Sequence, residues 1–196
     1  MEQRDLSRIV AFTDGVMAVA ITLLVLNLEV PRVPASELDD ALVDLFPSLV
    51  TYLLAFALVG RFWIIHHRMF EALREFDARL MTLNLGFLAL IVLMPFATEL
   101  YDRYTDEPLA CAVFGTIMGL AALLNWAMAT HTLRRDYVHE SHREARQVGS
   151  LIAIGVTLAF LLSVPVAFVS TTAAALLWLS TLVLRYPLGR FGATAR

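Results

Sequence analysis

The chain has 196 residues, of which 59% are hydrophobic and 17% are charged, and its mean hydropathy is +0.70. Soluble domains are about 45–50% apolar and about 25% charged, and a soluble core of this length cannot bury so large an apolar excess. This composition excludes a disordered chain and disfavours a soluble enzyme, while the net charge of −3 leaves no basic excess for a nucleic-acid partner.

Six apolar stretches are candidates for membrane-spanning helices, because about 20 mainly apolar residues are needed to cross a bilayer. They cover residues 8–30, 48–66, 80–98, 109–131, 148–165 and 169–186. The last two are separated by residues 164–168, in which Pro165 is the expected break. We therefore expect an all-α, polytopic membrane protein, with residues 1–196 in a single transmembrane domain.

The arginine distribution predicts the orientation of these spans, since short cytoplasmic loops are enriched in Arg and Lys. All fifteen cationic side chains are Arg, and only Arg32 and Arg103 fall in the connections after the first and third spans. The others are assigned to the N-terminal segment (Arg4, Arg8), to the second-to-third connection (Arg61, Arg68, Arg74, Arg79), to the fourth-to-fifth connection (Arg134, Arg135, Arg143, Arg146) and to the tail (Arg185, Arg190, Arg196). The pattern predicts six spans with both termini cytoplasmic, in the inner (plasma) membrane of the cell.

The two predicted outer connections are acidic. They contain nine carboxylates: Glu29, Glu37, Asp39, Asp40, Asp44, Glu99, Asp102, Asp106 and Glu107. Such a surface raises the local concentration of cations, although carboxylates in loops also serve simply to keep them hydrated. Both interpretations remain open from charge alone.

Ionisable side chains inside a span are costly and usually face other protein or water. Arg8 and Asp14 lie in the first span and point about 120° apart on a helix, so we expect them to reach neighbouring helices. Polar residues at the same depth end the second span (His66, His67) and begin the third (Asn84). A polar network joining three helices is the economical interpretation. Adjacent histidines diverge by about 100°, so no metal site is expected.

A stripe runs along another face of the first span. Gly15, Val19, Thr22, Leu26 and Glu29 follow steps of four, three, four and three, so they lie on one line of a helix. Around a common axis, Val19 and Leu26 would form narrow apolar rings, with Thr22 between them and Glu29 at the outer mouth. An apolar stripe on a membrane helix also serves ordinary helix packing, and the pattern alone does not separate the two.

The first three spans carry motifs that resemble those of the transmembrane protein 175 family, which includes lysosomal and bacterial potassium channels. The family signature Arg-x-x-x-Phe-Ser-Asp appears here as Arg8-x-x-x-Phe12-Thr13-Asp14, with Thr13 in place of Ser. The similarity continues through Trp63-x-x-His66-x-Arg68-x-Phe70, Leu83-Asn84-Leu85 and Leu93-Met-Pro95-Phe96. It covers about the first hundred residues, and the rest is similar only in span number and orientation.

The resemblance implies a cation channel with six helices per chain, and bacterial members of the family assemble as homotetramers in the lipid bilayer. By position relative to the signature, Val19, Thr22 and Leu26 correspond to the family's pore constriction on the first helix, and Val19 is smaller than the Ile or Leu usual there. The resemblance also implies a network that holds the pore helix, formed by Arg8, Phe12, Thr13, Asp14, Trp63, His66 and Asn84.

The resemblance implies passive permeation of K⁺ with modest preference over Na⁺. Strong selectivity is not expected, because the sequence has no carbonyl filter of the Thr-Val-Gly-Tyr-Gly type. No cofactor and no enzymatic activity are expected. The alternative is a small secondary transporter for a cation or small solute, although the spans show no polar midplane site and no internal repeat. An intramembrane enzyme would need a nucleophile beside Asp14 and His66, and none is evident.

Overall fold

The computed structural model describes residues 3–183, with side chains described from Leu6 onward, and it contains no strands in that range. The elements are α1 (Gln3–Leu23), the 3₁₀ turns η1 (Leu24–Asn27) and η2 (Ala35–Glu37), α2 (Leu38–Asp44), α3 (Phe46–Glu71), α4 (Ala78–Val92), α5 (Met94–Arg103), α6 (Pro108–Arg134), α7 (Glu140–Ala167) and α8 (Thr171–Val183). The prediction of an all-helical protein is confirmed.

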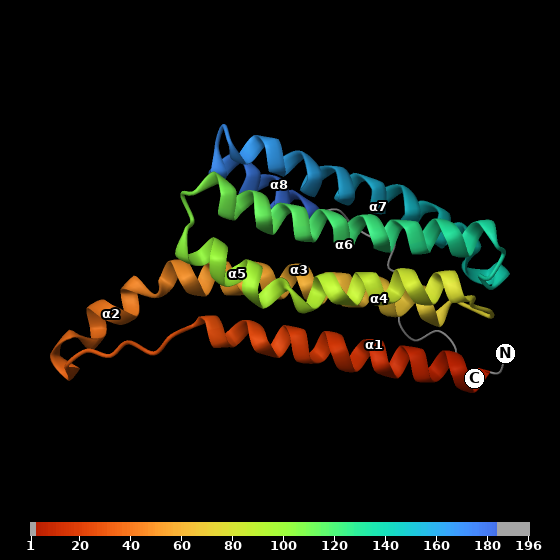
Figure 1. Cartoon of the computed structure of the whole chain (residues 1–196), viewed down its shortest axis with the longest axis horizontal. Helices are drawn as coiled ribbons and strands as arrows, with labels where there is room; N and C mark the ends of the chain where they lie inside the picture. Colours follow the sequence, from red (N-terminus) through yellow and green to blue (C-terminus); the bar gives the residue numbers. More distant parts are fainter. Residues whose placement is uncertain (1–2, 184–196) are drawn as a thin grey trace.

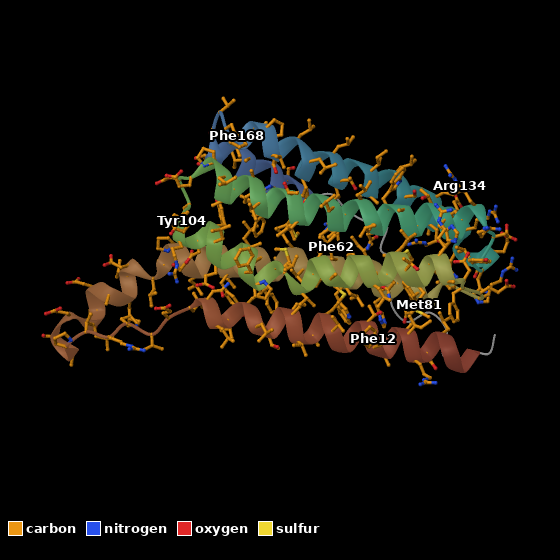
Figure 2. The ribbon with its side chains drawn as sticks, viewed as in Figure 1. Phe12, Phe62, Met81, Tyr104, Arg134 and Phe168 are labelled. Carbon is orange, nitrogen blue, oxygen red and sulfur yellow. The ribbon has the colours of Figure 1, made fainter. Side chains whose placement is uncertain are left out.

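The long helices lie side by side along one axis, in three layers (Figure 1). α1 forms one edge, α3 and the α4–α5 pair form the middle, and α6, α7 and α8 form the opposite layer. The segment containing α2 projects beyond one end of the bundle. Figure 2 places Tyr104 and Phe168 toward this end and Arg134 at the other. We call the end near α2 and Tyr104 the acidic end, because its connections contain Asp39, Asp40 and Asp106, and the end near Arg134 the arginine-rich end.

Within residues 3–183, five helical segments are long and apolar enough to cross a membrane. They are Leu6–Asn27, Phe46–Glu71, Ala78–Arg103, Pro108–Arg134 and Glu140–Ala167. The described part of α8 has 13 residues, about 20 Å of helix, which is shorter than the apolar core of a bilayer. Residues 184–186 of the predicted sixth span, and the arginines of the tail, lie outside the described residues.

The third span is broken where the sequence has Leu93-Met94-Pro95. α4 ends at Val92 and α5 begins at Met94, with Pro95 in its first turn. Proline has no N–H to donate, so it is tolerated at a helix start but interrupts a continuing helix. The carbonyl of Pro95, in the first turn of α5, accepts a hydrogen bond from the side-chain amide of Asn27 at 3.0 Å. This bond fixes the last turn after α1 to the middle layer.

Two predicted boundaries are wrong at α7. The helix begins at Glu140 rather than near residue 148, so Arg143 and Arg146 lie on it. It also runs through Pro165, which was predicted to end it, and stops at Ala167. Pro165 comes in the last turn, where the backbone bonds of Phe168, Val169 and Ser170 to the carbonyls of Pro165 and Val166 close the helix. A proline this near the end therefore bends little of the helix behind it.

Two arginines assigned to a connection belong to a helix instead. Arg61 and Arg68 both lie on α3, and Arg61 donates from Nη1 to the carbonyl of Leu182 on α8 at 3.1 Å. This bond ties the middle layer to α8. Hydropathy does not detect this arrangement, because the long side chain carries its charge away from the position of its own Cα.

Close packing in the last layer depends on small residues. A Cβ on Gly115 of α6 would lie 2.6 Å from Ser163 Oγ on α7, so only glycine permits this approach. Ser163 Oγ in turn accepts a 2.7 Å hydrogen bond from the indole of Trp178 on α8. Trp178 is fully buried and packs against Phe114 and Tyr101, with ring centroids 4.6 and 5.1 Å away. This cluster joins α5, α6, α7 and α8.

Candidate pore-lining face and its supports

α1 has two opposite faces with the same spacing. Its buried face consists of Thr13, Met17, Ala20 and, in η1, Leu24, which pack toward the middle layer. Residues two positions further along are about 200° away on a helix, so Gly15, Val19, Thr22 and Leu26 lie on the other face. All four are exposed in the protomer. The edge position of α1 leaves this stripe without a covering helix (Figure 1).

The stripe is mainly apolar. Val19 is 57% exposed and Leu26 is 71% exposed, while nothing lies within 4 Å of a Cβ placed on Gly15. The hydroxyl of Thr22 donates to the carbonyl of Val19 at 2.8 Å, so its proton is already used within the helix. The oxygen of Thr22 keeps its acceptor capacity toward the open side.

Glu29 follows the end of the helical turn at Asn27 rather than continuing the helix. Its carboxylate is exposed and lies 3.9 Å from the guanidinium of Arg103, which is also 2.9 Å from Glu99. One of the two arginines predicted for the outer connections is therefore shared between two carboxylates. The expectation that Glu29 extends the stripe as part of the same helix is wrong, because η1 ends before it.

A buried hydrogen-bonded chain joins α1, α4 and α3. The amide nitrogen of Asn84 donates to the hydroxyl of Thr13 at 2.9 Å, and the amide oxygen of Asn84 lies 2.8 Å from Nε2 of His66. All three side chains are at most 2% exposed. Because the oxygen of Asn84 accepts, Nε2 of His66 carries the proton. The imidazole is stacked between Phe70 and Phe87, with centroids 4.4 and 5.1 Å away.

A second, half-exposed contact joins α1 to α3. The indole N–H of Trp63 donates to Oδ1 of Asp14 at 2.9 Å, and Nδ1 of His67 lies 3.5 Å from Oδ2 of the same carboxylate. Five of the seven residues predicted for the network therefore lie in two contacts at the arginine-rich half of α1: Thr13, Asp14, Trp63, His66 and Asn84. Their role in holding a pore helix stays a prediction.

Arg8 and Phe12 are placed differently from that prediction. Both are exposed, and they border a groove with Asn84 and Met81. Figure 2 shows Phe12 on α1 close to Met81 on α4. Neither residue takes part in the hydrogen-bonded contacts found in the described part of the chain. Both side chains lie on an open face of α1. There the guanidinium of Arg8 can remain hydrated, and it gains little free energy from an ion pair.

His67 was grouped with the polar residues of the first three spans, but it was not among the seven residues that the family resemblance implied for the pore-helix network. A signal for it was present, because Trp63, His67 and Glu71 are spaced by four and so share one face of α3. The indole of Trp63 stacks on the imidazole of His67 at 5.4 Å between centroids. Spacing alone did not reveal that this face meets Asp14 of α1.

Another cluster that sequence reasoning missed closes the arginine-rich end. Asp77 is the N-cap of α4, accepting from the backbone of Leu80 at 2.8 Å, and its Oδ2 lies 2.9 Å from Nε2 of His131 on α6. Tyr137 completes it with a 3.4 Å bond to Asp77. Desolvation works to raise the pKa of Asp77, but the bonds from Leu80, His131 and Tyr137 outweigh it and hold that pKa below its usual value.

The connections on either side of this cluster are also joined through their backbones. The N–H of Arg74 donates to the carbonyl of Tyr137 at 2.9 Å, and that of His139 to the carbonyl of Ala72 at 3.0 Å. Asp136, which has a positive φ of 58°, pairs with the side chains of Arg74 and Arg143. The α3–α4 and α6–α7 connections therefore form one unit, which ties the middle layer to the last.

Comparison with known proteins agrees with this architecture. Residues 8–95 match the family described as endosomal/lysosomal potassium channel TMEM175. The chain is 34% identical to a potassium channel of Streptomyces collinus over 171 residues, covering 83% of this chain and 82% of that protein. It is 37% identical to a potassium channel of Chamaesiphon minutus, covering 63% of this chain and 64% of that protein.

The animal relatives are much longer. The chain is 31% identical to the human endosomal/lysosomal proton channel TMEM175 over 64% of its own length, but it spans only 28% of that protein. Among solved structures, the crystal structure of a lysosomal potassium-selective channel TMEM175 homolog from Chamaesiphon minutus aligns with a TM-score of 0.75 and 28% identity. That alignment covers 92% of this chain and 96% of the other.

Five bilayer-length helices, an edge helix with an open apolar stripe and a polar cluster behind it define a multi-pass membrane protein of the ion-channel class. The chain belongs to the TMEM175 family. It is accordingly a member of a channel family and not an enzyme.

Proposed function

We propose that the chain forms a potassium-permeable cation channel in which α1 of each subunit lines a central pore. The observation that carries the proposal is the stripe on α1, whose residues Val19, Thr22 and Leu26 line the open face of a membrane-length helix at the edge of the bundle, with a hydroxyl between two apolar residues. The potassium channels of Streptomyces collinus and Chamaesiphon minutus, as relatives, support K⁺ as the permeant ion. Four subunits around one axis would cover the stripe.

The stripe limits conduction through its effect on the water around a permeating cation. Rings of Leu26 and Val19 narrow the pore with side chains that cannot replace the water around a cation, so they limit conduction by dewetting. Thr22, whose oxygen stays available as an acceptor, is the polar layer between the rings. Side-chain rings of this kind discriminate weakly between K⁺ and Na⁺, so the preference for K⁺ is modest.

The entrance and the membrane topology follow from charge. The acidic end raises the local concentration of cations next to the stripe, with the Glu29 carboxylate at the outer mouth. The arginine-rich end lies in the cytoplasm, and the chain crosses the plasma membrane six times, with α8 beginning the sixth span and both termini cytoplasmic.

The test is cysteine accessibility in reconstituted channels. Val19→Cys and Leu26→Cys are each introduced, and a charged thiol reagent is applied while K⁺ current is recorded in a bilayer. Current is expected to fall by more than half for both variants. The wild type is a suitable background, because its one cysteine, Cys111, is fully buried.

Leu158→Cys is the matched control, since Leu158 is an exposed apolar residue of α7, in the layer furthest from α1. Its current should be insensitive to the reagent. Block of Leu158→Cys together with no effect at both stripe positions would remove α1 from the pore. The alternative, a secondary transporter, predicts saturable uptake coupled to a proton or sodium gradient, whereas a channel passes K⁺ down its gradient without coupling.

A further inference from the structure

Asn125 is a buried polar residue inside α6. Its side chain is 3% exposed, and its amide nitrogen Nδ2 has no hydrogen-bond acceptor among the described residues. It comes nine residues before α6 ends at Arg134, so it lies within a membrane-length segment. The surrounding lipid offers no acceptor at that depth, so an amide without a partner keeps the full free-energy cost of leaving water.

A small cavity lies beside Asn125, between α3, α6 and α7. Apart from this amide its wall is apolar, and it is formed by Phe62, Ile65, Ala122, Ile152, Ala153 and Val156. Figure 2 places Phe62 midway between the two ends of the bundle. The cavity has a volume of about 20 Å³. One water molecule needs roughly 10–15 Å³ of such space, so the cavity accommodates one water molecule and no larger ligand.

Small residues of α6 surround the amide. Ala121, Ala122 and Ala129 stand three or four positions from Asn125 along the helix, so they share its face. All three are at most 3% exposed, which shows that this face is covered by the neighbouring helices. The sequence therefore puts one amide into a face whose other side chains are too short to fill the space around it.

The chemistry of the wall selects the ligand. It contains no carboxylate, and Nδ2 of Asn125 presents only N–H donors, so the site does not suit a cation. A lipid acyl chain has no acceptor to offer the amide, and a second subunit cannot reach a side chain that is 3% exposed. Water is neutral, fits the volume, accepts from an N–H and donates two protons to carbonyl oxygens.

We propose that one water molecule is bound in this cavity as a fixed part of the bundle. It accepts a hydrogen bond from Nδ2 of Asn125 and donates to carbonyl oxygens of the facing helices. The site does not depend on the proposed pore, because it lies away from the stripe of α1. It does stabilise the packing of α3, which carries Trp63 and His66, the residues that contact α1 and α4.

The experiment is solid-state nuclear magnetic resonance of the full-length protein in lipid bilayers, with magnetisation started on water protons and detected on ¹⁵N. Asparagine is labelled in its side-chain amide, and the chain has only three such residues, Asn27, Asn84 and Asn125. The Asn125 signal is identified by its loss in Asn125→Leu. Asn125→Ser, whose smaller side chain fits the same space, gives the same assignment if the leucine variant does not assemble.

Two reference signals set the scale. Asn27 is the hydrated reference, because it is half-buried and lines an open cavity at the acidic end together with Glu29 and Asp102. The indole N–H of Trp178, labelled with ¹⁵N in the same sample, is the dry reference, since it is fully buried and already donates to Ser163.

The Asn125 amide is expected to receive magnetisation from water at transfer times as short as those of Asn27. Transfer as slow as that of Trp178 would overturn the proposal, because the amide would then have no water beside it. Faster transfer from lipid acyl protons than from water would overturn it as well, since the cavity would then hold lipid. Neither result bears on α1 as the pore helix, which is tested separately by the cysteine variants.

Discussion

Asn84 of α4 donates its side-chain amide to the hydroxyl of Thr13 on α1, at 2.9 Å, and both groups are buried. The same amide accepts from His66 of α3. One side chain therefore connects the three helices whose motifs resemble those of the TMEM175 family, directly behind the open stripe of α1. Its removal should loosen the edge helix more than the loss of any exposed contact.

Asn84→Leu is expected to destabilise the folded protein, because it leaves the Thr13 hydroxyl and the Nε2–H of His66 buried without partners. Each such group costs about 1–3 kcal/mol. Thermal unfolding of the detergent-solubilised protein measures the effect. The control is Thr82→Val on the same helix, whose hydroxyl is exposed and bonds only to its own backbone at Ala78. Equal melting temperatures for the two variants would contradict the central position of Asn84.

Leu26→Ala and Val19→Ala are expected to raise K⁺ flux. Smaller side chains widen the apolar rings, so water enters the constriction more easily and the free-energy barrier for a hydrated K⁺ ion is lower. Both residues are exposed in the protomer, so expression and melting temperature should stay near those of the wild type. Flux into liposomes, with potassium and sodium gradients compared, is the measurement. Unchanged flux in both variants would count against these positions as the constriction.

Asp77→Asn is expected to destabilise the protein near neutral pH and to matter less in acid. Asparagine still accepts from Leu80 but loses the charge that faces His131. The pKa of Asp77 in the folded protein lies below the ordinary carboxyl pKa of about 4. The ionised carboxylate therefore contributes its full stabilisation above about pH 4, and this stabilisation is lost as pH falls through the lowered pKa of the folded state. The melting-temperature difference between wild type and variant should therefore shrink toward pH 3.

The comparison variant for this series is Asp106→Asn, an exposed carboxylate in the α5–α6 connection. It should leave the melting temperature unchanged at every pH. A difference for Asp77→Asn that grows as pH falls would have the wrong sign and would refute the assignment.

Gly115→Ala is expected to destabilise the last layer by about 1–3 kcal/mol, because the new methyl group displaces Ser163 and breaks its bond to Trp178. Gly155→Ala on α7 is the matched substitution, with nothing within 4 Å of its Cβ, and it should be neutral or stabilising by up to about 1 kcal/mol. Thermal unfolding compares the two. Similar destabilisation by both would mean that helix flexibility, not the close approach of α6 and α7, explains the glycine.

Much of the site was predictable where it depends on local pattern. Thr13, Asp14, Trp63, His66 and Asn84 were selected as motif residues at one membrane depth, and the structure brings them into two contacts. The stripe on α1 was predicted from helical spacing, which holds because successive residues rotate by about 100° whatever surrounds the helix. Arg8 and Phe12 shared the motif but not the contacts, because a motif does not state which face its helix buries.

The sequence by itself determined the helical class and the places of the first five membrane-length segments, because a backbone in lipid must satisfy its own hydrogen bonds and only long apolar helices do so locally. Tertiary structure alone decided which partners the charged side chains meet: Arg61 meets the carbonyl of Leu182 on α8, Asp77 meets His131, and His67 meets Asp14. These contacts join residues 53 or more positions apart, across helices whose relative rotation depends on packing. No local periodicity encodes that rotation, so the supports of the proposed pore helix became visible only in the folded chain.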